Sequence, residues 1–304
     1  MILSKTKDNR FYSHNTMQGT VSLTFCDSGE NHAGMKMLGE RVEPGEGFAV
    51  EDLQRAKANF EALGCECEMF DFASMLREIA GETHQLNIPD GGAGTVLIIR
   101  GGAKVFGDVE EMKKEMGGFE WDKKYWCARR KKVLNKHARA NVCFDVQACD
   151  ADYEQGQGTI VSWDAVPEVA KIRSGLKFML GRKGQDLVCE GNQYFSEKCG
   201  IGFHGDAERR KVVAVRLGNA MRMQWCWYYK HSAVGRKCEV LLEDGDMYIM
   251  EEKAVGTDWR RSSIFTLRHA AGAEKYLKEK RKEGSDEIAK EKLLELFANE
   301  QTEE

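Results

Sequence analysis

Several features that would assign the chain to a class of protein are scarce or absent. Only three prolines occur in 304 residues, so the 31 glycines are expected to mark most turns. No apolar run approaches the roughly 18 residues of a membrane span, and residues 1–14 lack the apolar stretch of a secretory signal. The formal net charge of −4 excludes a broadly basic nucleic-acid-binding surface. We therefore expect an intracellular protein, cytoplasmic or nuclear, with no membrane partner.

The ten cysteines do not indicate a disulfide framework. Such frameworks belong to short secreted chains, so we expect reduced thiols that mostly pack as small apolar side chains. Cys65 and Cys67 form a C-x-C pair, but no second pair at matching spacing completes a zinc site. Gly200, Gly202 and Gly205 spell G-x-G-x-x-G, yet polar residues precede them and a strand-like segment follows. A dinucleotide site needs the opposite context.

The pattern of apolar residues divides the chain into three regions. Residues 1–100 combine predicted strands, the first at 20–26, with one helix at 49–63, which indicates a small α/β unit of unknown role. Residues 101–272 predict a helix at 167–182 followed by short strands, the last at 264–268, with Gly-Asp turns, which is typical of an antiparallel barrel or jelly roll. Residues 273–304 alternate Lys, Arg and Glu and predict a solvated helix or tail. The predicted fold class is α+β, with a jelly-roll core, an N-terminal α/β unit and flanking helices.

The most informative motif is His204-Gly-Asp206. Two residues apart on an extended strand, both side chains point to one face and can hold one metal ion. A histidine and a carboxylate are two-thirds of the facial triad of non-haem Fe(II) oxygenases. Upstream, Asn192 and Tyr194 offer an amide and a phenol to a carboxylate or keto oxygen. Arg268 offers a planar guanidinium group for a terminal carboxylate.

From about residue 185 to residue 272, the chain resembles the AlkB-like branch of Fe(II)/2-oxoglutarate-dependent dioxygenases. The matching segments follow the order of that family and are Asn192–Tyr194, Gly202–Glu208, Val215–Gly218, Gly245–Met250 and Thr266–Arg268. The resemblance implies a double-stranded β-helix core, Fe(II) on His204 and Asp206, and 2-oxoglutarate held by Asn192, Tyr194 and Arg268. It also implies hydroxylation or demethylation of a substrate, which in AlkB-like members is an alkylated nucleic-acid base.

One metal ligand that the resemblance implies has no histidine at its expected place. The family has a second metal-binding histidine between the Gly-Asp turn and the final arginine, but none occurs between Gly245 and Leu267. Asp258 lies close to that place and is our predicted third ligand, although it could instead cap a turn. His269 is less suitable, because neighbouring residues on a strand face opposite sides and Arg268 is expected to point inward. The missing second histidine favours an alternative, a degenerate, non-catalytic binding or scaffold protein that keeps the jelly roll.

Basic and aromatic residues raise the hypothesis of a nucleic-acid partner, as a single strand or a flipped base. Arg129–Lys132 and the cations at 136–139 can contact phosphates, while the aromatic residues of 225–229 offer stacking surface. We interpret these aromatics as core residues, because they alternate along a predicted strand. The basic run is compatible with two interpretations, a phosphate-binding surface or a solvated face. The sequence is therefore also compatible with a protein or small-molecule substrate.

Overall fold

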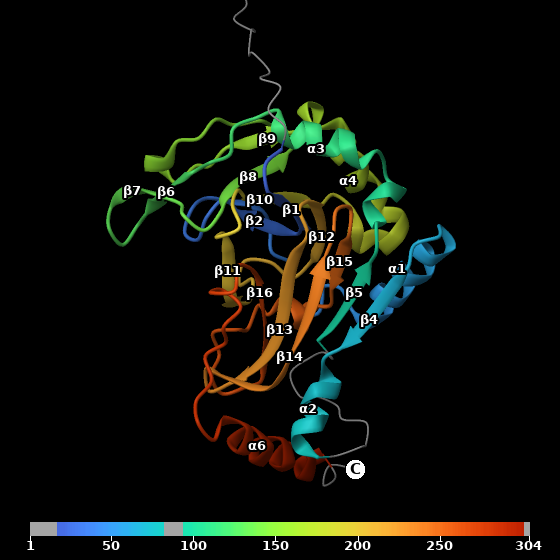
Figure 1. The fold of residues 1–304 in the computed structure, drawn as a ribbon, viewed down its shortest axis with the longest axis vertical. Helices are drawn as coiled ribbons and strands as arrows, with labels where there is room; N and C mark the ends of the chain where they lie inside the picture. The colour runs from blue at the N-terminus through green and yellow to red at the C-terminus, as the bar shows by residue number, and fades with distance from the viewer. Residues whose placement is uncertain (1–16, 82–93, 301–304) are drawn as a thin grey trace, which may run out of the picture.

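The computed structural model describes residues 17–81 and 94–300, with side chains to residue 296. The expectation for residues 1–14 lies outside this part. The architecture is mixed α+β and consists mostly of sheet (Figure 1). None of the described helices is long and apolar enough to cross a membrane.

Two sheets form the centre of the molecule. The larger sheet contains, in spatial order, β4 (Cys67–Asp71), β5 (Thr95–Ile99), β15 (Met247–Met250), β12 (Val212–Gly218), β1 (Thr20–Cys26), β10 (Val188–Tyr194), β8 (Ala140–Asp145) and β9 (Ile160–Ser162). The smaller sheet contains β11 (Gly200–His204), β16 (Thr266–Gly272), β13 (Met221–Tyr229) and β14 (Ser232–Leu242). Two hairpins stand apart, β2 (Ser28–Glu30) with β3 (Met37–Gly39), and β6 (Lys124–Cys127) with β7 (Lys132–Asn135).

The chain passes repeatedly between the two sheets after residue 188. β10, β12 and β15 belong to the larger sheet, whereas β11, β13, β14 and β16 belong to the smaller one. β1, far earlier in the sequence, is hydrogen-bonded between β10 and β12. A four-strand portion of the larger sheet therefore faces the four strands of the smaller sheet.

One apolar cluster fills part of the space between the sheets. Alternate residues of β12 and β15, including Ala214 and Tyr248, meet Trp225 and Trp227 of β13. The rings of Trp225 and Tyr248 lie 6.3 Å apart and nearly perpendicular. This arrangement confirms that the aromatic residues of 225–229 belong largely to the core, because both tryptophans are fully buried.

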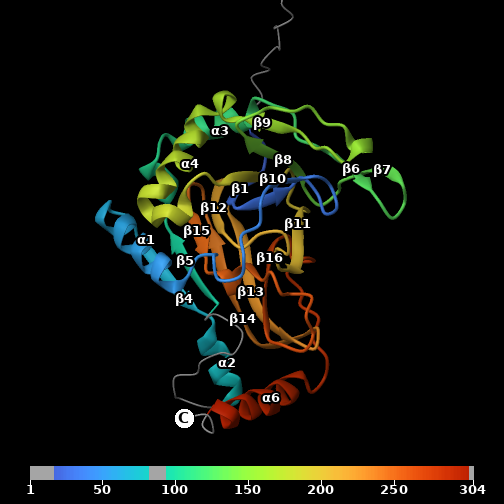
Figure 2. The same ribbon diagram turned by 180° about the vertical axis from the view of Figure 1, so that it is seen from behind.

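Helices cover the other face of the larger sheet, as the view from behind shows (Figure 2). They are α1 (Val50–Ala62), α3 (Val109–Gly117) and α4 (Pro167–Leu180). Their apolar residues recur at helical spacing and pack against the odd-numbered residues of β1 and β12, such as Leu23 and Val213. α2 (Ala73–Ala80) packs against α6 (Ser285–Glu300) at one end of the molecule, and α5 (Glu252–Val255) precedes β16.

Several predicted elements are confirmed, but the predicted boundary at residue 100 does not coincide with a sheet boundary. The helix predicted at 49–63 is α1, that at 167–182 is α4, and the strand at 20–26 is β1. The strands of the first hundred residues that join a large sheet, β1, β4 and β5, all lie in the same sheet as β10 and β12. The segment 273–304 forms α6 over much of its length.

Because β1 has strand neighbours on both sides, truncating its buried core is expected to destabilise the whole protein. Leu23 is fully buried against the covering helices. We expect Leu23→Ala to lower the free energy of unfolding by about 2–5 kcal/mol, measured by urea denaturation. The matched control is Leu241→Ala, whose side chain is 48% exposed, with an expected change within about 0.5 kcal/mol. A small effect of Leu23→Ala would contradict a structural role for β1.

Candidate metal centre

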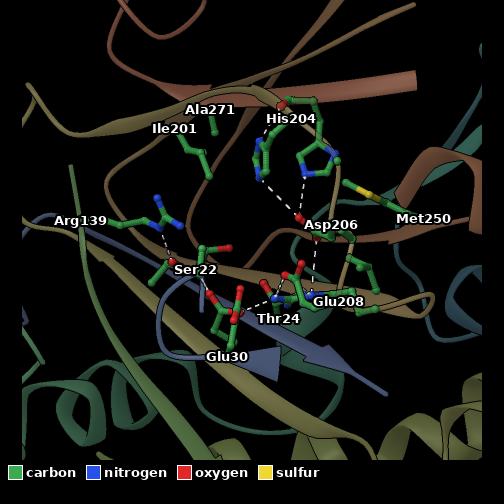
Figure 3. Close-up of a pocket in the computed structure, with 18 of the residues that line it drawn as sticks. Ser22, Thr24, Glu30, Arg139, Ile201, His204, Asp206, Glu208, Met250 and Ala271 are labelled. Atoms are coloured by element: carbon green, nitrogen blue, oxygen red, sulfur yellow. Dashed lines mark hydrogen bonds and ion pairs between the residues drawn. The ribbon is translucent and has the colours of Figure 1, made fainter. Parts of the chain in front are cut away.

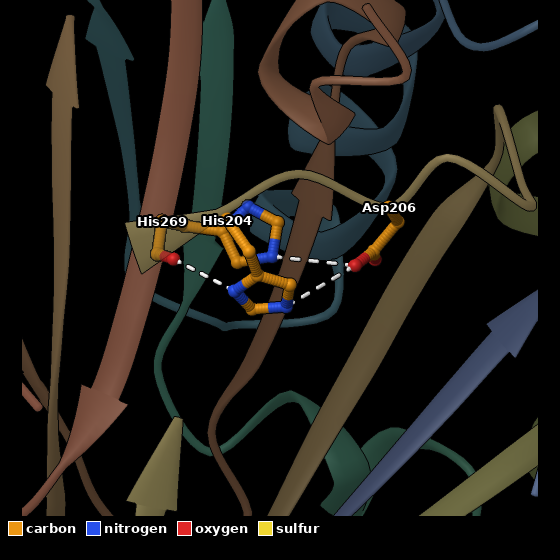
Figure 4. Close-up of side chains that lie close together, drawn as sticks. All are labelled: His204, Asp206 and His269. Carbon is orange, nitrogen blue, oxygen red and sulfur yellow. Dashed lines mark hydrogen bonds and ion pairs between the residues drawn. The ribbon is translucent and has the colours of Figure 1, made fainter. Parts of the chain in front are cut away.

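His204, Asp206 and His269 form the one group in the described part of the chain whose ligand atoms suit a metal ion, all lying within 4.8 Å of one another. Figure 4 shows both imidazole rings turned toward the carboxylate. Asp206 Oδ1 lies 3.4 Å from His204 Nε2 and 3.6 Å from His269 Nε2. Ligand atoms about 2.1 Å from a shared ion are separated by about 3 Å or slightly more. The spacing and the donor set of two imidazoles and one carboxylate therefore fit a divalent transition metal.

Strand pairing brings the two histidines together. His204 ends β11 and is paired directly with His269 of β16, across a register irregularity between Ile201 and His204. Directly opposed residues of an antiparallel pair project to the same face with their Cβ atoms close together. The rings accordingly lie 4.5 Å apart, edge to face.

A glycine between His204 and Asp206 lets the chain turn tightly against a neighbouring loop. A Cβ on Gly205 would lie 2.1 Å from the carbonyl oxygen of Gly256. The amide of Asp206 donates a hydrogen bond to the carbonyl of Val255, 3.0 Å away, on the same loop. The H-G-D spacing thus reflects backbone packing as well as ligand placement.

Backbone carbonyls orient His204. Its Nδ1 lies 2.9 Å from the carbonyl oxygen of Gly202 and 3.0 Å from that of His269. A proton on Nδ1 satisfies these acceptors and leaves Nε2 with a lone pair for a metal. Burial lowers the pKa of His269, and the neighbouring His204 adds to the shift, so the second imidazole is also favoured in its neutral, metal-binding form.

Asp206 is held as a carboxylate. Burial acts to raise its pKa, but Arg209 and the two imidazoles outweigh burial and hold the pKa well below its usual range. Arg209 is only 4% exposed, and its Nε lies 3.7 Å from Asp206 Oδ2, the oxygen on the other side from the histidines. Its guanidinium group also pairs with Glu190 and Glu208. Asp206 Oδ1, the oxygen that faces the two histidines, is therefore not the one nearest to Arg209.

The cluster opens into a cavity of about 280 Å³. Apolar side chains of Ile201, Val212 and Met250 line it near the cluster, and Glu30, Glu190 and Glu208 add carboxylates. Burial raises the pKa of Glu30 to about 7. Figure 3 shows Arg139 entering the cavity on the side away from Asp206.

Asn192 and Tyr194, predicted to bind a cosubstrate, both line this cavity. They alternate on β10 with residues that face the helices, so both point to the inner face of the sheet. Asn192 Oδ1 accepts hydrogen bonds from Arg139 Nε at 2.6 Å and from Asn141 Nδ2. The carboxamide is thereby fixed, and Tyr194 is buried, which raises the pKa of its phenol.

The other two predicted ligands lie elsewhere. Asp258 Oδ2 accepts a hydrogen bond from Lys253 Nζ, 2.7 Å away, and His269 takes the third place in the cluster. Arg268 is outside the residues that line the cavity. Its guanidinium carbon lies 4.1 Å from the ring centre of Tyr228, on the outer face of the smaller sheet. The prediction of Asp258 and Arg268 as site residues is corrected accordingly.

Both errors follow from one assumption, that Arg268 points inward, which excluded its neighbour His269 from the site. The last strand was also expected to end at residue 268, whereas β16 continues to Gly272. Over this longer strand Leu267, His269 and Ala271 point inward, and Arg268 points outward. The apolar Leu267 and Ala271 flanking His269 at a spacing of two were the signal that could have identified the third ligand.

Comparison with known proteins identifies a relative but no characterised family. No family model matches the chain. The chain is 37% identical over 260 residues to "Uncharacterized protein R156" of Acanthamoeba polyphaga mimivirus. The match covers 85% of this chain and 98% of the viral protein. The likeness thus includes most of both chains.

Removal of His269 is expected to abolish tight metal binding, because it removes one of three ligands. We expect His269→Ala to weaken Co²⁺ binding at least about 100-fold, measured by titration of the visible absorption bands. Asp258→Asn serves as the control and should bind Co²⁺ within about threefold of the unmodified protein, because Asp258 is paired with Lys253. The reverse ranking of the two variants would restore Asp258 as the third ligand.

Proposed function

The chain belongs to the same protein family as the mimivirus protein R156, and we propose that it is an Fe(II)/2-oxoglutarate-dependent oxygenase. The observation that carries this proposal is the group formed by His204, Asp206 and His269 at the wall of a cavity. Two imidazoles and one carboxylate would hold an Fe(II) ion and leave room on it for a cosubstrate and oxygen. The metal, when bound, would supply the redox chemistry that activates oxygen.

We also infer that the core is a double-stranded β-helix. Support comes from the alternation of β10 to β16 between two facing sheets, with the paired histidines on β11 and β16. β1 fills the position between β10 and β12, so the eighth strand of this jelly roll comes from the N-terminal part of the chain. An arrangement with four facing strands on each side is what a jelly roll requires.

The residues around the cluster perform three tasks in this proposal. Gly202 and His269 carbonyls orient His204, and Arg209 holds Asp206, so the ligands are positioned before the metal binds. Asn192 and Tyr194 line the cavity and can bind the cosubstrate through an amide and a phenol. The apolar walls limit access of water to the reacting atoms.

The alternative of a non-catalytic scaffold was based on the lack of a second histidine among the ligands predicted from the sequence. Because His269 supplies a second imidazole to the cluster, this lack no longer favours the scaffold. Retention of a fixed imidazole, a carboxylate with a lowered pKa and an adjoining cavity instead favours an enzyme.

The oxygenase proposal is tested by anaerobic addition of Fe(II) and 2-oxoglutarate. We expect a charge-transfer absorption band, followed on admission of air by release of succinate. His204→Ala should lose both signals, because it removes a metal ligand. His231→Ala is a suitable control, since His231 lies outside the metal-binding group. Absence of the band in the unmodified protein would refute the proposal.

The substrate that we propose is a nucleic acid, on the evidence of the β6–β7 hairpin. Residues 123–139 contain no acidic residue, although the whole chain has a net charge of −4. The exposed cations of this segment are Lys123, Lys124, Arg129, Arg130, Lys131 and Lys132. Among the described residues, no carboxylate lies within 4 Å of Arg129 or Arg130 to form an ion pair. Such an uncompensated basic surface suits the phosphates of a nucleic acid.

The hairpin also contacts a residue of the cavity wall. His32 lines the cavity, and its ring stacks on Tyr125 of β6 with 3.7 Å between ring centres. Tyr125 in turn lines a surface hollow together with Arg129 and Arg130. Phosphates held by the hairpin would place a neighbouring base near His32, where aromatic rings can stack on it.

Neutralising the hairpin is expected to weaken binding of single-stranded oligonucleotides. Arg129→Gln with Arg130→Gln should lower the affinity of a fluorescent oligonucleotide about 10-fold at low salt and reduce the salt dependence of binding. Lys114→Gln with Lys171→Gln removes the same number of charges from α3 and α4, behind the larger sheet, and is the control. Equal losses in both double variants would argue against a nucleic-acid surface on the hairpin.

A further inference from the structure

Arg216 of β12 is among the largest fully buried side chains, and it lines the cavity that holds the metal cluster. Only 1% of the residue is exposed. Its Nε and Nη1 atoms have no hydrogen-bond partner within the described ranges 17–81 and 94–300. The contact that it does make is with an aromatic ring, since its guanidinium carbon lies 5.9 Å from the ring centre of Tyr194.

A buried guanidinium group without an anion is an exceptional arrangement. Arginine retains its proton under all ordinary conditions, so it cannot avoid the cost of burial by becoming neutral. A buried charge is normally paired or hydrogen-bonded, because desolvation otherwise disfavours the folded state. Tyr194 and Tyr248 beside it supply phenols but no formal charge at neutral pH, since burial raises the pKa of each. Among the described residues, no carboxylate lies within 4 Å of the Arg216 guanidinium group to form an ion pair.

The register of the larger sheet places Arg216 in a polar row. Ser22 of β1 is paired with Asn192 of β10 on one side and with Arg216 of β12 on the other. Adjacent strands lie about 4.8 Å apart, so the three side chains stand next to one another on the inner face. All three line the same cavity as His204 and Asp206. One small molecule in the cavity can therefore contact both this polar row and the metal cluster.

We propose that Arg216, with Ser22 and Asn192, binds one carboxylate of a small dicarboxylate whose other end reaches the metal cluster. Arginine binds a carboxylate through two parallel hydrogen bonds, which satisfies the orphaned guanidinium nitrogens. Arg216 thereby takes the role that sequence analysis assigned to Arg268. The identification of the ligand as the cosubstrate 2-oxoglutarate rests on the proposed oxygenase function, but the anion subsite does not require the metal.

The test measures binding of succinate, 2-oxoglutarate, acetate and inorganic phosphate to metal-free protein in EDTA by calorimetry and thermal melting. We expect succinate and 2-oxoglutarate to bind at least tenfold more tightly than acetate or phosphate and to raise the melting temperature. Arg216→Met removes the charge and keeps the apolar stem, so binding should fall at least tenfold while the ligand-free protein melts no lower. Arg268→Met is the matched control and should bind both dicarboxylates normally.

Three results would overturn the inference. These are normal dicarboxylate binding by Arg216→Met, loss of binding by Arg268→Met instead, and equal affinity for phosphate and succinate. If Arg216→Met does not fold, Arg216→Lys replaces it: the charge stays, the two-pronged geometry is lost, and binding should still fall about tenfold. Succinate binding that persists in a protein unable to bind Fe(II) would refute the oxygenase function and leave the Arg216 subsite supported.

Discussion

β1 is hydrogen-bonded to β10 on one side and to β12 on the other along its full length from Thr20 to Cys26. Through these pairings β1 joins β10 and β12 into one sheet. The pairings also determine which residues of the three strands lie side by side. The inward row contains Asn192, Ser22 and Arg216, whereas the intervening residues pack against the helices. A shift of one residue in either pairing would turn this row away from the cavity, because side chains alternate between faces. The site therefore depends on the register of a strand that contributes no metal ligand.

Much of the secondary structure could be predicted, because apolar spacing reports local conformation. β1, α1 and α4 were found within one or two residues of their ends. Which strands pair with one another could not be predicted in the same way. The alternation of residues along β1 carries no information on which strands are its neighbours in the sheet. The bounds of β11 were not predicted, because two of its five residues are glycines and only Ile201 is β-branched. Its terminal His204 and the adjacent Asp206 were nevertheless identified from their spacing.

The candidate site was predicted in part for the same reason. Motifs within one segment, such as His204 with Asp206 or Asn192 with Tyr194, have side chains whose common face follows from their spacing. The remaining residues come from other strands, and the face that each residue occupies depends on how its strand packs in the tertiary structure. Assigning Arg268 to the inner face of β16 was enough to exclude its neighbour His269. Arg216 could not be identified from the sequence at all, because only the tertiary structure shows that its Nε and Nη1 atoms are buried without a hydrogen-bond partner in the described part of the chain.

The place of β1 in the sheet has a consequence for folding during synthesis. Its partners are residues 188–194 and 212–218, so more than 150 residues of chain separate β1 from either neighbour. Contacts of such long sequence separation form slowly, because a large loop must close before they contribute. On the ribosome, the apolar residues Val21, Leu23 and Phe25 emerge long before their partners are made. We expect β1 to insert late in folding, so the cavity acquires its complete polar row only after synthesis has passed residue 218.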